Sequence, residues 1–297
     1  MSKKSADVVI NTLSRRKFIE RATAAGVIVA AAGHATENEV EAQMRNQTAA
    51  KQSAPHGIKN QPARLVTLEA KPAPVKMDLA KTAVIVIDME NDFGAKGGMF
   101  DRAGIDISMI QKAVAPTANV LAAARREGIK IIYVKMGYRP DLSDLGAADS
   151  VNRVRHLQIL HVGTSMRAPD GRESRILIRD NWGTEIVPEL KPHASDVEMY
   201  KTRFSGFYKT ELDAMLKNMG ARHLIITGCT TSICVEATIR DAMYRDYLPV
   251  LLADCTAEPI GYGLPRSNHD ASLLTIQALL GWVSSSEEFT KALGVST

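Results

Sequence analysis

The sequence predicts an α/β fold, namely a three-layer, doubly wound and mostly parallel sheet with helices on both faces. Short apolar runs rich in Val and Ile alternate with segments of helical periodicity from residue 77 onward. The apolar runs are continuous, which is typical of parallel strands that are buried on both faces. The helical segments between them are long enough to connect neighbouring parallel strands.

The elements follow in chain order. Strands are expected at short runs rich in apolar or β-branched residues, at residues 82–87, 129–135, 197–200, 224–227 and 250–252. Helices are expected where apolar residues recur every three or four positions, at residues 107–126, 210–218, 232–245 and 269–280. The stretch between residues 136 and 182 has weak periodicity and many Arg, Asp and Gly residues. We interpret it as an irregular segment that covers the substrate.

The first 35 residues look like a removable twin-arginine export signal. Arg15 and Arg16 precede a mild apolar stretch at residues 22–32 and a small-residue segment at 33–35. Residues 1–35 contain six Lys or Arg and two Asp or Glu, so they carry all of the formal charge of +4. The remaining chain balances 31 basic against 31 acidic residues, and its charge indicates no nucleic-acid partner. We expect a periplasmic or exported protein; the alternative is an ordinary basic arm on a cytoplasmic protein.

Residues 36–76 are polar, contain scattered prolines and show no sustained period. We interpret them as a flexible linker or arm, the alternative being that residues 62–74 wrap onto a neighbouring subunit. The folded domain is expected at residues 77–297. The apolar stretch at the front is too short to span a bilayer, so no membrane association is expected beyond export.

Cys234 occupies a position that suits a nucleophile. It follows an apolar strand, a glycine turn at Gly228 and the start of a helix. At a helix N-terminus the free backbone N–H groups and the helix dipole favour the thiolate. Cys229 and Cys255, in contrast, are interpreted as buried small apolar residues.

Two partners for Cys234 are expected at the same edge of the sheet. Asp88 ends the strand at residues 82–87, and Lys201 ends the strand at residues 197–200. Ligands of open α/β sheets bind beyond the carboxyl ends of the strands. We therefore expect Asp88, Lys201 and Cys234 to converge on one site.

These residues, in the motifs Val-Ile-Asp-Met-Glu-Asn-Asp-Phe, Lys-Thr-Arg-Phe-Ser-Gly-Phe and Thr-Gly-Cys-Thr-Thr-Ser-Ile-Cys, resemble the isochorismatase-like cysteine hydrolases. Within that superfamily the chain is most similar to ureidoacrylate amidohydrolases, through residues 97–106, 203–207 and 281–284. It is also similar to biuret hydrolases, through residues 139–145 and 175–179. The resemblance identifies residues 77–297 as a cysteine hydrolase domain.

The resemblance implies a catalytic triad of Asp88, Lys201 and Cys234, with oxyanion donors at the backbone N–H groups of Thr230 and Cys234. It also implies a cis peptide between Cys229 and Thr230. The expected function is cleavage of a C–N bond in a small ureido or amide substrate through a cysteine thioester, of the ureidoacrylate or biuret type. The alternatives are an isochorismatase-type hydrolase of another small molecule and a catalytically silent binding protein of the same fold. Isochorismatases that act on a vinyl ether lack the cysteine. The presence of Cys234 therefore favours an amidohydrolase over an isochorismatase-type hydrolase.

Candidate substrate-binding residues are aromatic side chains near strand ends and arginines whose planar guanidinium suits a carboxylate or ureido oxygen. They are Phe93, Trp182, Phe204 and Arg139, with Arg179 and Arg203 as further arginines.

No metal or cofactor is expected. His156 and His161 are five residues apart, which does not place them on one helix face. The Asp-x-His pattern that the nicotinamidase branch carries after the corresponding strand is absent after Lys135. Three cysteines provide no disulfide framework, and we expect a homo-oligomer, either a dimer or a tetramer, that acts on a small-molecule substrate.

Overall fold

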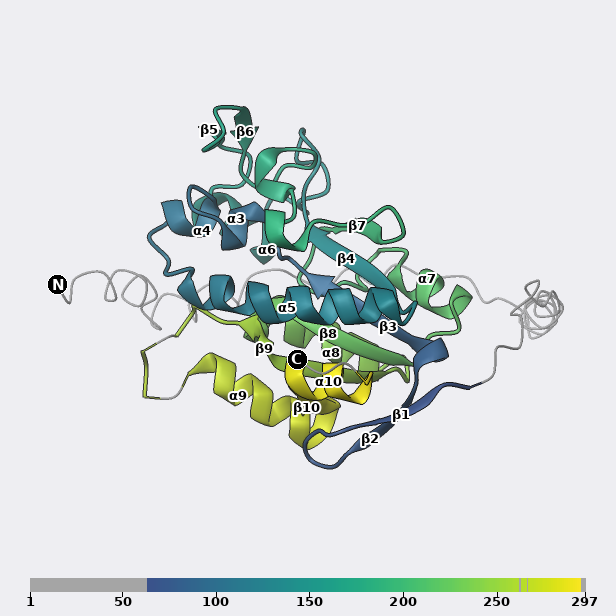
Figure 1. The fold of residues 1–297 in the computed structure, drawn as a ribbon. Helices are drawn as coiled ribbons and strands as arrows, with labels where there is room; N and C mark the ends of the chain where they lie inside the picture. Colours follow the sequence, from purple (N-terminus) through teal and green to yellow (C-terminus); the bar gives the residue numbers. More distant parts are fainter. Residues whose placement is uncertain (1–62, 262, 266, 295–297) are drawn as a thin grey trace, which may run out of the picture. The chain divides into compact units, whose positions relative to one another are not determined.

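The computed structural model describes residues 63–261, 263–265 and 267–294. At its centre is a six-stranded sheet in the order β10-β9-β8-β3-β4-β7, in which all neighbouring strands run parallel (Figure 1). This arrangement confirms the predicted α/β class. The export signal predicted for residues 1–35 and most of the predicted linker lie outside the described residues.

The five predicted strands are all present. They are β3 (Thr82–Ile87), β4 (Lys130–Met136), β7 (Val197–Lys201), β8 (His223–Cys229) and β9 (Leu248–Ala257). The sixth strand, β10 (Trp282–Ser284), was not predicted because three residues are too few to show a period.

The four predicted helices are also present, with shifted ends. They are α5 (Ser108–Arg126), α7 (Leu212–Asn218), α8 (Glu236–Met243) and α9 (Asn268–Thr275). A π-helical turn, η4 (Thr231–Val235), precedes α8, and a second, η5 (Ile276–Leu280), follows α9. Four short helices were not predicted: α3 (Asn91–Gly94), α4 (Met99–Arg102), α6 (Val151–Gln158) and α10 (Ser286–Ala292).

The strand order places helices on both faces of the sheet. The chain moves from β3 to β4 in one direction and from β8 to β9 in the opposite direction. Because such crossovers are right-handed, α5 and α8 must cover opposite faces. Both helices contact β9, and α10 packs on the same side as α5. Figure 1 shows α5 lying across the sheet. The order reverses between β3 and β8, which is where an open sheet of this type binds its ligand.

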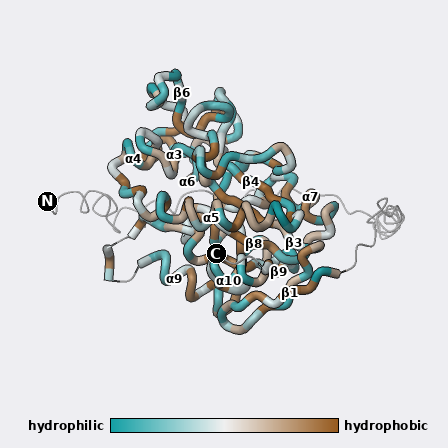
Figure 2. The backbone as a smooth tube through the Cα atoms, in the orientation of Figure 1, coloured by the Kyte–Doolittle hydropathy of each residue, from teal (hydrophilic) through white to brown (hydrophobic). Residues whose placement is uncertain are grey.

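Burial explains why these segments form the sheet and its cover. All six residues of β3 are buried, because β4 and β8 pair with its two edges and helices cover its faces. In α5 the buried residues Ile110, Ala113, Val120, Leu121 and Ala124 share one face at helical spacing. Figure 2 shows hydrophobic residues concentrated along the central strands.

The prediction of a linker up to residue 76 is wrong for its last part. Residues 65–78 form an antiparallel hairpin of β1 (Leu65–Leu68) and β2 (Val75–Asp78), followed by the 3-10 turn η1 (Leu79–Lys81). The loop of this hairpin pairs with the chain's own sheet, because Lys71 and Val283 exchange backbone hydrogen bonds of 2.8 and 3.0 Å. The hairpin thus covers the edge of β10.

The segment at residues 136–182 is more ordered than predicted. It contains α6 and a second hairpin, formed by β5 (Ser165–Arg167) and β6 (Glu173–Arg175). Two 3-10 turns follow, η2 (Trp182–Thr184) and η3 (Pro188–Leu190). Tyr138 and Ile178 form a bridge across the base of the segment, which therefore returns to the sheet close to the end of β4.

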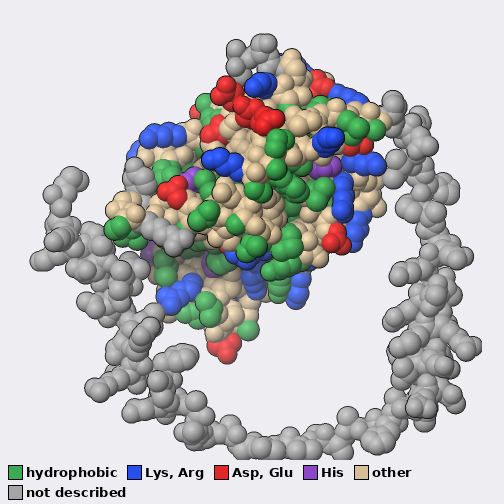
Figure 3. All heavy atoms as spheres, turned by 90° about the horizontal axis from the view of Figure 1, so that it is seen from below, with side chains coloured by type: hydrophobic (Ala, Val, Ile, Leu, Met, Phe, Trp, Pro, Cys, Tyr) green, Lys and Arg blue, Asp and Glu red, His purple; other side chains and the backbone are tan. Residues whose placement is uncertain are grey.

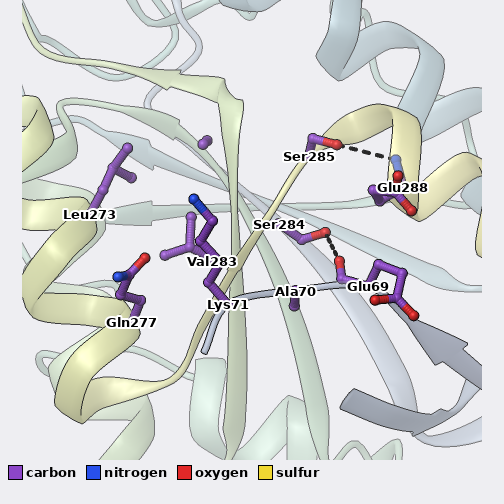
Figure 4. Close-up of a pocket in the computed structure, with 10 residues that line it drawn as sticks. Glu69, Ala70, Lys71, Leu273, Gln277, Val283, Ser284, Ser285 and Glu288 are labelled. Carbon is purple, nitrogen blue, oxygen red and sulfur yellow. Dashed lines mark hydrogen bonds between the residues drawn. The ribbon is translucent and has the colours of Figure 1, made fainter. Parts of the chain in front are cut away.

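A cavity of about 490 Å³ lies at the β10 edge, between the loop of the first hairpin and α9 (Figure 4). The Ser284 hydroxyl donates a hydrogen bond of 2.6 Å to the carbonyl oxygen of Glu69 beside it. None of the three predicted catalytic residues lines this cavity. On the face seen in Figure 3, basic and acidic side chains both occur among hydrophobic ones. No helix in the described part of the chain is long and apolar enough to cross a membrane.

Candidate active site

Three strand ends bring the predicted triad together. Asp88 follows β3 directly, Lys201 is the last residue of β7, and Cys234 lies in η4 just beyond β8. The ends of β3 and β8 flank the point at which the strand order reverses. The structure therefore places the three residues where the topology of the sheet predicts a ligand site.

The three side chains form one buried cluster. The Lys201 ammonium lies 2.8 Å from Oδ2 of Asp88 and donates to Sγ of Cys234 at 3.4 Å. The side chains of Asp88 and Lys201 are fully buried, and Cys234 is 5% exposed. The contact between Asp88 and Lys201 is an ion pair rather than an aligned hydrogen bond, since neither Asp88 carboxylate oxygen meets hydrogen-bond geometry with a described residue. These oxygens remain able to accept a proton.

Local backbone geometry aims these groups. Asp88 has a φ of 51°, which turns the chain sharply where β3 ends. Gly228 has a φ of 119°, and a Cβ atom there would lie 2.0 Å from the carbonyl oxygen of Ile87. Only glycine permits β8 to approach β3 this closely. The predicted cis peptide between Cys229 and Thr230 is present.

Electrostatics in the cluster differ from the sequence-based expectation. Burial and the Asp88 carboxylate raise the pKa of Cys234, and the opposing influence of Lys201 does not outweigh them. The position of Cys234 at a helix N-terminus, which favours the thiolate, is therefore not accompanied by a lowered pKa of this thiol. The physical reason is that Asp88 neutralises the charge of Lys201, so no net positive charge is left to stabilise a thiolate.

The partners of Cys234 suit proton transfer. Burial raises the pKa of Asp88, although the Lys201 ammonium acts in the opposite direction. A raised pKa makes this carboxylate a better acceptor for the thiol proton. Burial alone would lower the pKa of Lys201, but Asp88 and Cys234 outweigh burial and raise the pKa of Lys201. The lysine therefore stays charged, and its charge favours the ionised form of Asp88.

Hydrogen bonds anchor the turn that carries Cys234. The Glu258 carboxylate accepts from the Ser232 N–H at 2.9 Å and from the Ser232 hydroxyl at 2.6 Å. The Thr231 hydroxyl lies 3.0 Å from Thr256 Oγ1 and 3.0 Å from His269 Nδ1. These contacts tie the turn to the end of β9 and to α9, and they fix the direction of the Cys234 side chain.

The other two cysteines have no catalytic geometry. Cys229 is fully buried, and its thiol donates to the carbonyl oxygen of Asp88 at 3.1 Å. Cys255 is fully buried in β9. The prediction that both are buried packing residues is confirmed.

Sequence reasoning missed Glu90, a second acidic residue beside the triad. Its side chain is fully buried, and neither carboxylate oxygen has a hydrogen-bond partner among the described residues. Burial and the nearby carboxylates of Asp88 and Asp92 raise the pKa of Glu90 well above its usual range. Burial and these neighbours therefore favour the protonated form of the Glu90 carboxyl group. Its signal in the sequence was an acidic residue within an otherwise buried segment after β3.

The raised pKa of Glu90 makes a prediction about stability. The folded chain keeps a proton on Glu90 that the unfolded chain releases above about pH 4.3. The stabilisation of the folded state by this bound proton is fully present below that pH. It is lost as the pH rises towards the pKa of Glu90 in the folded state. As the pH rises, the unfolding free energy of the parent protein should therefore fall relative to that of Glu90→Gln, by up to about 1.4 kcal/mol per pH unit. Denaturant titrations at pH 5, 7 and 9 measure this difference, and parallel pH curves for the two proteins would contradict it.

The predicted aromatic substrate-binding residues come from three segments of the chain. Phe93 is buried in α3 and packs edge-to-face on Phe100, with ring centroids 4.9 Å apart. Trp182 begins η2, and its carbonyl oxygen accepts from the Asn91 side chain at 2.8 Å. Phe204 is 42% exposed and stacks on His156 at 5.8 Å.

The three candidate arginines, in contrast, come together. Arg139, Arg179 and Arg203 line one cavity of about 380 Å³. Thr202 and Arg203 form part of its wall and follow Lys201 directly in the chain. Sequence reasoning could name the arginines separately, but it could not show that they share a cavity.

Among the described residues, no group of three or more His, Cys, Asp or Glu side chains is placed to hold a metal ion. His156 is buried and its Nδ1 contacts the carbonyl oxygen of Asn152 at 2.7 Å, so this nitrogen is engaged within α6. His161 lies beyond the end of that helix.

Comparison with known proteins agrees with this geometry. The model of the Isochorismatase domain matches residues 82–288. The ureidoacrylate amidohydrolase RutB of Caulobacter segnis is 37% identical over 229 residues, which cover 77% of this chain and 92% of the relative. The protein of the same name from Methylorubrum extorquens strain AM1 is 36% identical over 242 residues, covering 81% of this chain and 94% of the relative.

Solved structures show the same fold. A cysteine hydrolase from Pseudomonas syringae pv. phaseolicola 1448A is similar with a TM-score of 0.60 and 27% identity, covering 80% of this chain and 99% of that chain. N-carbamoylsarcosine amidase from Thermoplasma acidophilum is similar with a TM-score of 0.50 and 26% identity, covering 70% of this chain and 97% of that chain. With a matching domain model over most of its length and relatives above one-third identity, this chain belongs to the isochorismatase family.

Proposed function

We propose that this protein is an amidohydrolase that cleaves a C–N bond of a small ureido or amide substrate through a thioester on Cys234. The observation that carries the proposal is the buried cluster of Asp88, Lys201 and Cys234 at the switch point of the sheet. A nucleophile, a base and a group that orients the base are the components of covalent acyl transfer.

In the first half-reaction Sγ of Cys234 attacks the carbonyl carbon of the substrate while the thiol proton moves to Asp88. This order follows from the raised pKa of Cys234, because the thiol must lose its proton as it attacks. The carbon–sulfur bond forms first. The carbon–nitrogen bond then breaks, and Asp88 returns the proton to the leaving nitrogen.

In the second half-reaction Asp88 takes a proton from a water molecule, which attacks the thioester. The carbon–sulfur bond breaks, and the thiol of Cys234 is regenerated when Asp88 returns the proton. Lys201 remains an ammonium throughout, since its pKa is raised by the two acidic groups that it contacts. Lys201 therefore orients the base rather than transferring a proton.

The oxyanion formed at each attack needs hydrogen-bond donors. We assign this role to the backbone N–H groups of Thr230 and Cys234, which belong to the anchored turn after β8. The contacts of Ser232 with Glu258 would hold these donors in place while charge develops.

Two observations favour a ureido substrate. The relatives at 36–37% identity are named for ureidoacrylate, and a structural relative is named for an N-carbamoyl substrate. Biuret is the second candidate, because it contains the same carbamoyl group. The presence of the complete triad argues against a silent binding protein. Apolar side chains would stabilise a scaffold at least as well as a buried ion pair beside a thiol.

A substrate panel tests the proposal. The purified protein is given ureidoacrylate, biuret and simple amides, with ammonia release as the measurement, and isochorismate, with pyruvate release as the measurement. We expect ammonia from at least one ureido substrate, and an unchanged rate after exhaustive treatment with a chelator, because the triad needs no metal. Pyruvate release alone, or activity lost to the chelator and restored by zinc or manganese, would contradict the proposal.

A further inference from the structure

A strongly basic cavity lies next to the catalytic lysine. Its charged lining consists of Arg139, Arg179, Arg203, Lys209 and one carboxylate, Asp144, around a volume of about 380 Å³. Four cations against one carboxylate leave an excess of three positive charges. We call this space the basic cavity.

Two of the four cations are free to bind an anion. The Arg179 guanidinium is paired with Oδ2 of Asp144 at 2.8 Å, and the Arg203 guanidinium donates to the carbonyl oxygen of Asp144 at 3.2 Å. The side chains of Arg139 and Lys209, in contrast, make no hydrogen bond or ion pair with the described residues. A guanidinium and an ammonium that line the same cavity offer donors that match a carboxylate.

The cavity is held in shape by specific contacts. The Tyr208 ring contacts two cations, with Arg203 at 5.5 Å and Lys209 at 5.6 Å from its centroid. Gly146 has a φ of 112°, and a Cβ atom there would lie 2.8 Å from Nη2 of Arg203. Glycine at this position therefore makes room for the guanidinium.

The wall of the basic cavity is linked to Lys201 through the chain and through a hydrogen bond. Thr202 and Arg203 line the cavity and follow Lys201 directly. The carbonyl oxygen of Arg203 accepts a hydrogen bond from Nζ of Lys201 at 3.3 Å, and the carbonyl oxygen of Thr202 accepts from the Tyr138 hydroxyl at 3.3 Å. An anion bound in the cavity thus contacts the segment that positions the catalytic lysine.

We propose that the basic cavity recognises the carboxylate of the substrate, and that the protein acts on ureido acids in preference to neutral ureido compounds such as biuret. This inference rests on the proposed function and specifies its substrate class. Because Asp144 is already paired with Arg179, Arg139 and Lys209 are the two cations left to bind the carboxylate. The same chemistry would also fit a free oxyanion that acts as an effector, and the experiment distinguishes the two.

The test compares Arg139→Gln, Lys209→Gln and the double variant with Arg126→Gln, which removes one exposed positive charge at the end of α5 without touching the cavity. The measured quantity is the ratio of kcat/KM for ureidoacrylate to kcat/KM for biuret. We expect this ratio to fall at least about tenfold in each single variant and further in the double variant, through a higher KM for ureidoacrylate, and to stay at the parent value in Arg126→Gln. An unchanged ratio in the double variant would overturn the inference.

A binding experiment tests this inference separately from the proposed function. Ureidoacrylate, maleate and inorganic sulfate are titrated calorimetrically into Cys234→Ala, with and without the Arg139→Gln and Lys209→Gln changes. Ureidoacrylate binding that weakens at least about tenfold with these changes supports the inference, even if turnover is never seen and the proposed function fails. Sulfate binding that does not compete with ureidoacrylate would show an effector site and overturn the inference, as would equal ureidoacrylate affinity in both backgrounds.

Discussion

Cys234→Ser is expected to leave a folded protein with at least about 10³-fold lower kcat/KM, equivalent to about 4 kcal/mol of transition-state stabilisation. The hydroxyl is a much weaker acid than the thiol, so Asp88 cannot take its proton as readily during attack. The fold should survive, because the two side chains are of similar size and Cys234 is 5% exposed in an anchored turn. Steady-state kinetics and thermal unfolding measure the two effects separately.

Cys255→Ser is the matched control for this result. Cys255 is buried like Cys234, but it lies in β9 and its thiol is influenced by Asp254 and Thr117 rather than by the triad. It should lose stability in the same way as any buried cysteine but keep kcat/KM near the parent value. If Cys234→Ser retained activity within about tenfold, or about 1.4 kcal/mol, Cys234 would not be the nucleophile.

Asp88 and Lys201 are expected to show strongly non-additive stability. Asp88→Asn leaves a buried ammonium and Lys201→Met leaves a buried carboxyl group, and each should lower the unfolding free energy by about 3–5 kcal/mol. The double variant removes both charges and should recover most of that loss. Its activity should remain as low as that of Asp88→Asn, about 10²–10⁴-fold below the parent, because the base is absent.

The surface pair Asp213 and Lys217 provides the control for this cycle. Their charged atoms lie 2.7 Å apart, but the lysine side chain is 67% exposed. Lys217→Met should therefore cost about 0.5 kcal/mol or less. If the double variant of Asp88 and Lys201 is no more stable than the less stable of the two single variants, the two groups do not form a buried pair. Recovered activity in the double variant would exclude Asp88 as the base.

The parts of the fold that were predictable share strong local signals. The run at residues 82–87 is apolar throughout, and the predicted strand coincides with β3. The hairpin of β1 and β2 was missed because its strands have four residues each and prolines lie between them, so its stability comes from pairing with Val283, far along the chain. Local periodicity carries no information about such a partner.

The site was predictable only in its residue types. Strand ends placed Asp88, Lys201 and Cys234 at one edge, and the structure brings them into contact. The raised pKa of Cys234 was not predictable, because it depends on burial and on the Asp88 carboxylate beside the thiol. The burial of Glu90 and the grouping of the arginines depend likewise on packing between segments distant in the sequence.

The most direct test of the account is to look for the covalent intermediate on Cys234. The parent protein is mixed with ureidoacrylate, quenched in acid within milliseconds to seconds, digested and analysed by mass spectrometry. We expect the peptide that carries Cys234 to gain the mass of one carbamoyl group in place of a hydrogen during turnover, and to gain nothing in Asp88→Asn. Ammonia release at the full rate with this peptide unmodified at every time point, or with the carbamoyl group on another residue, would contradict the account.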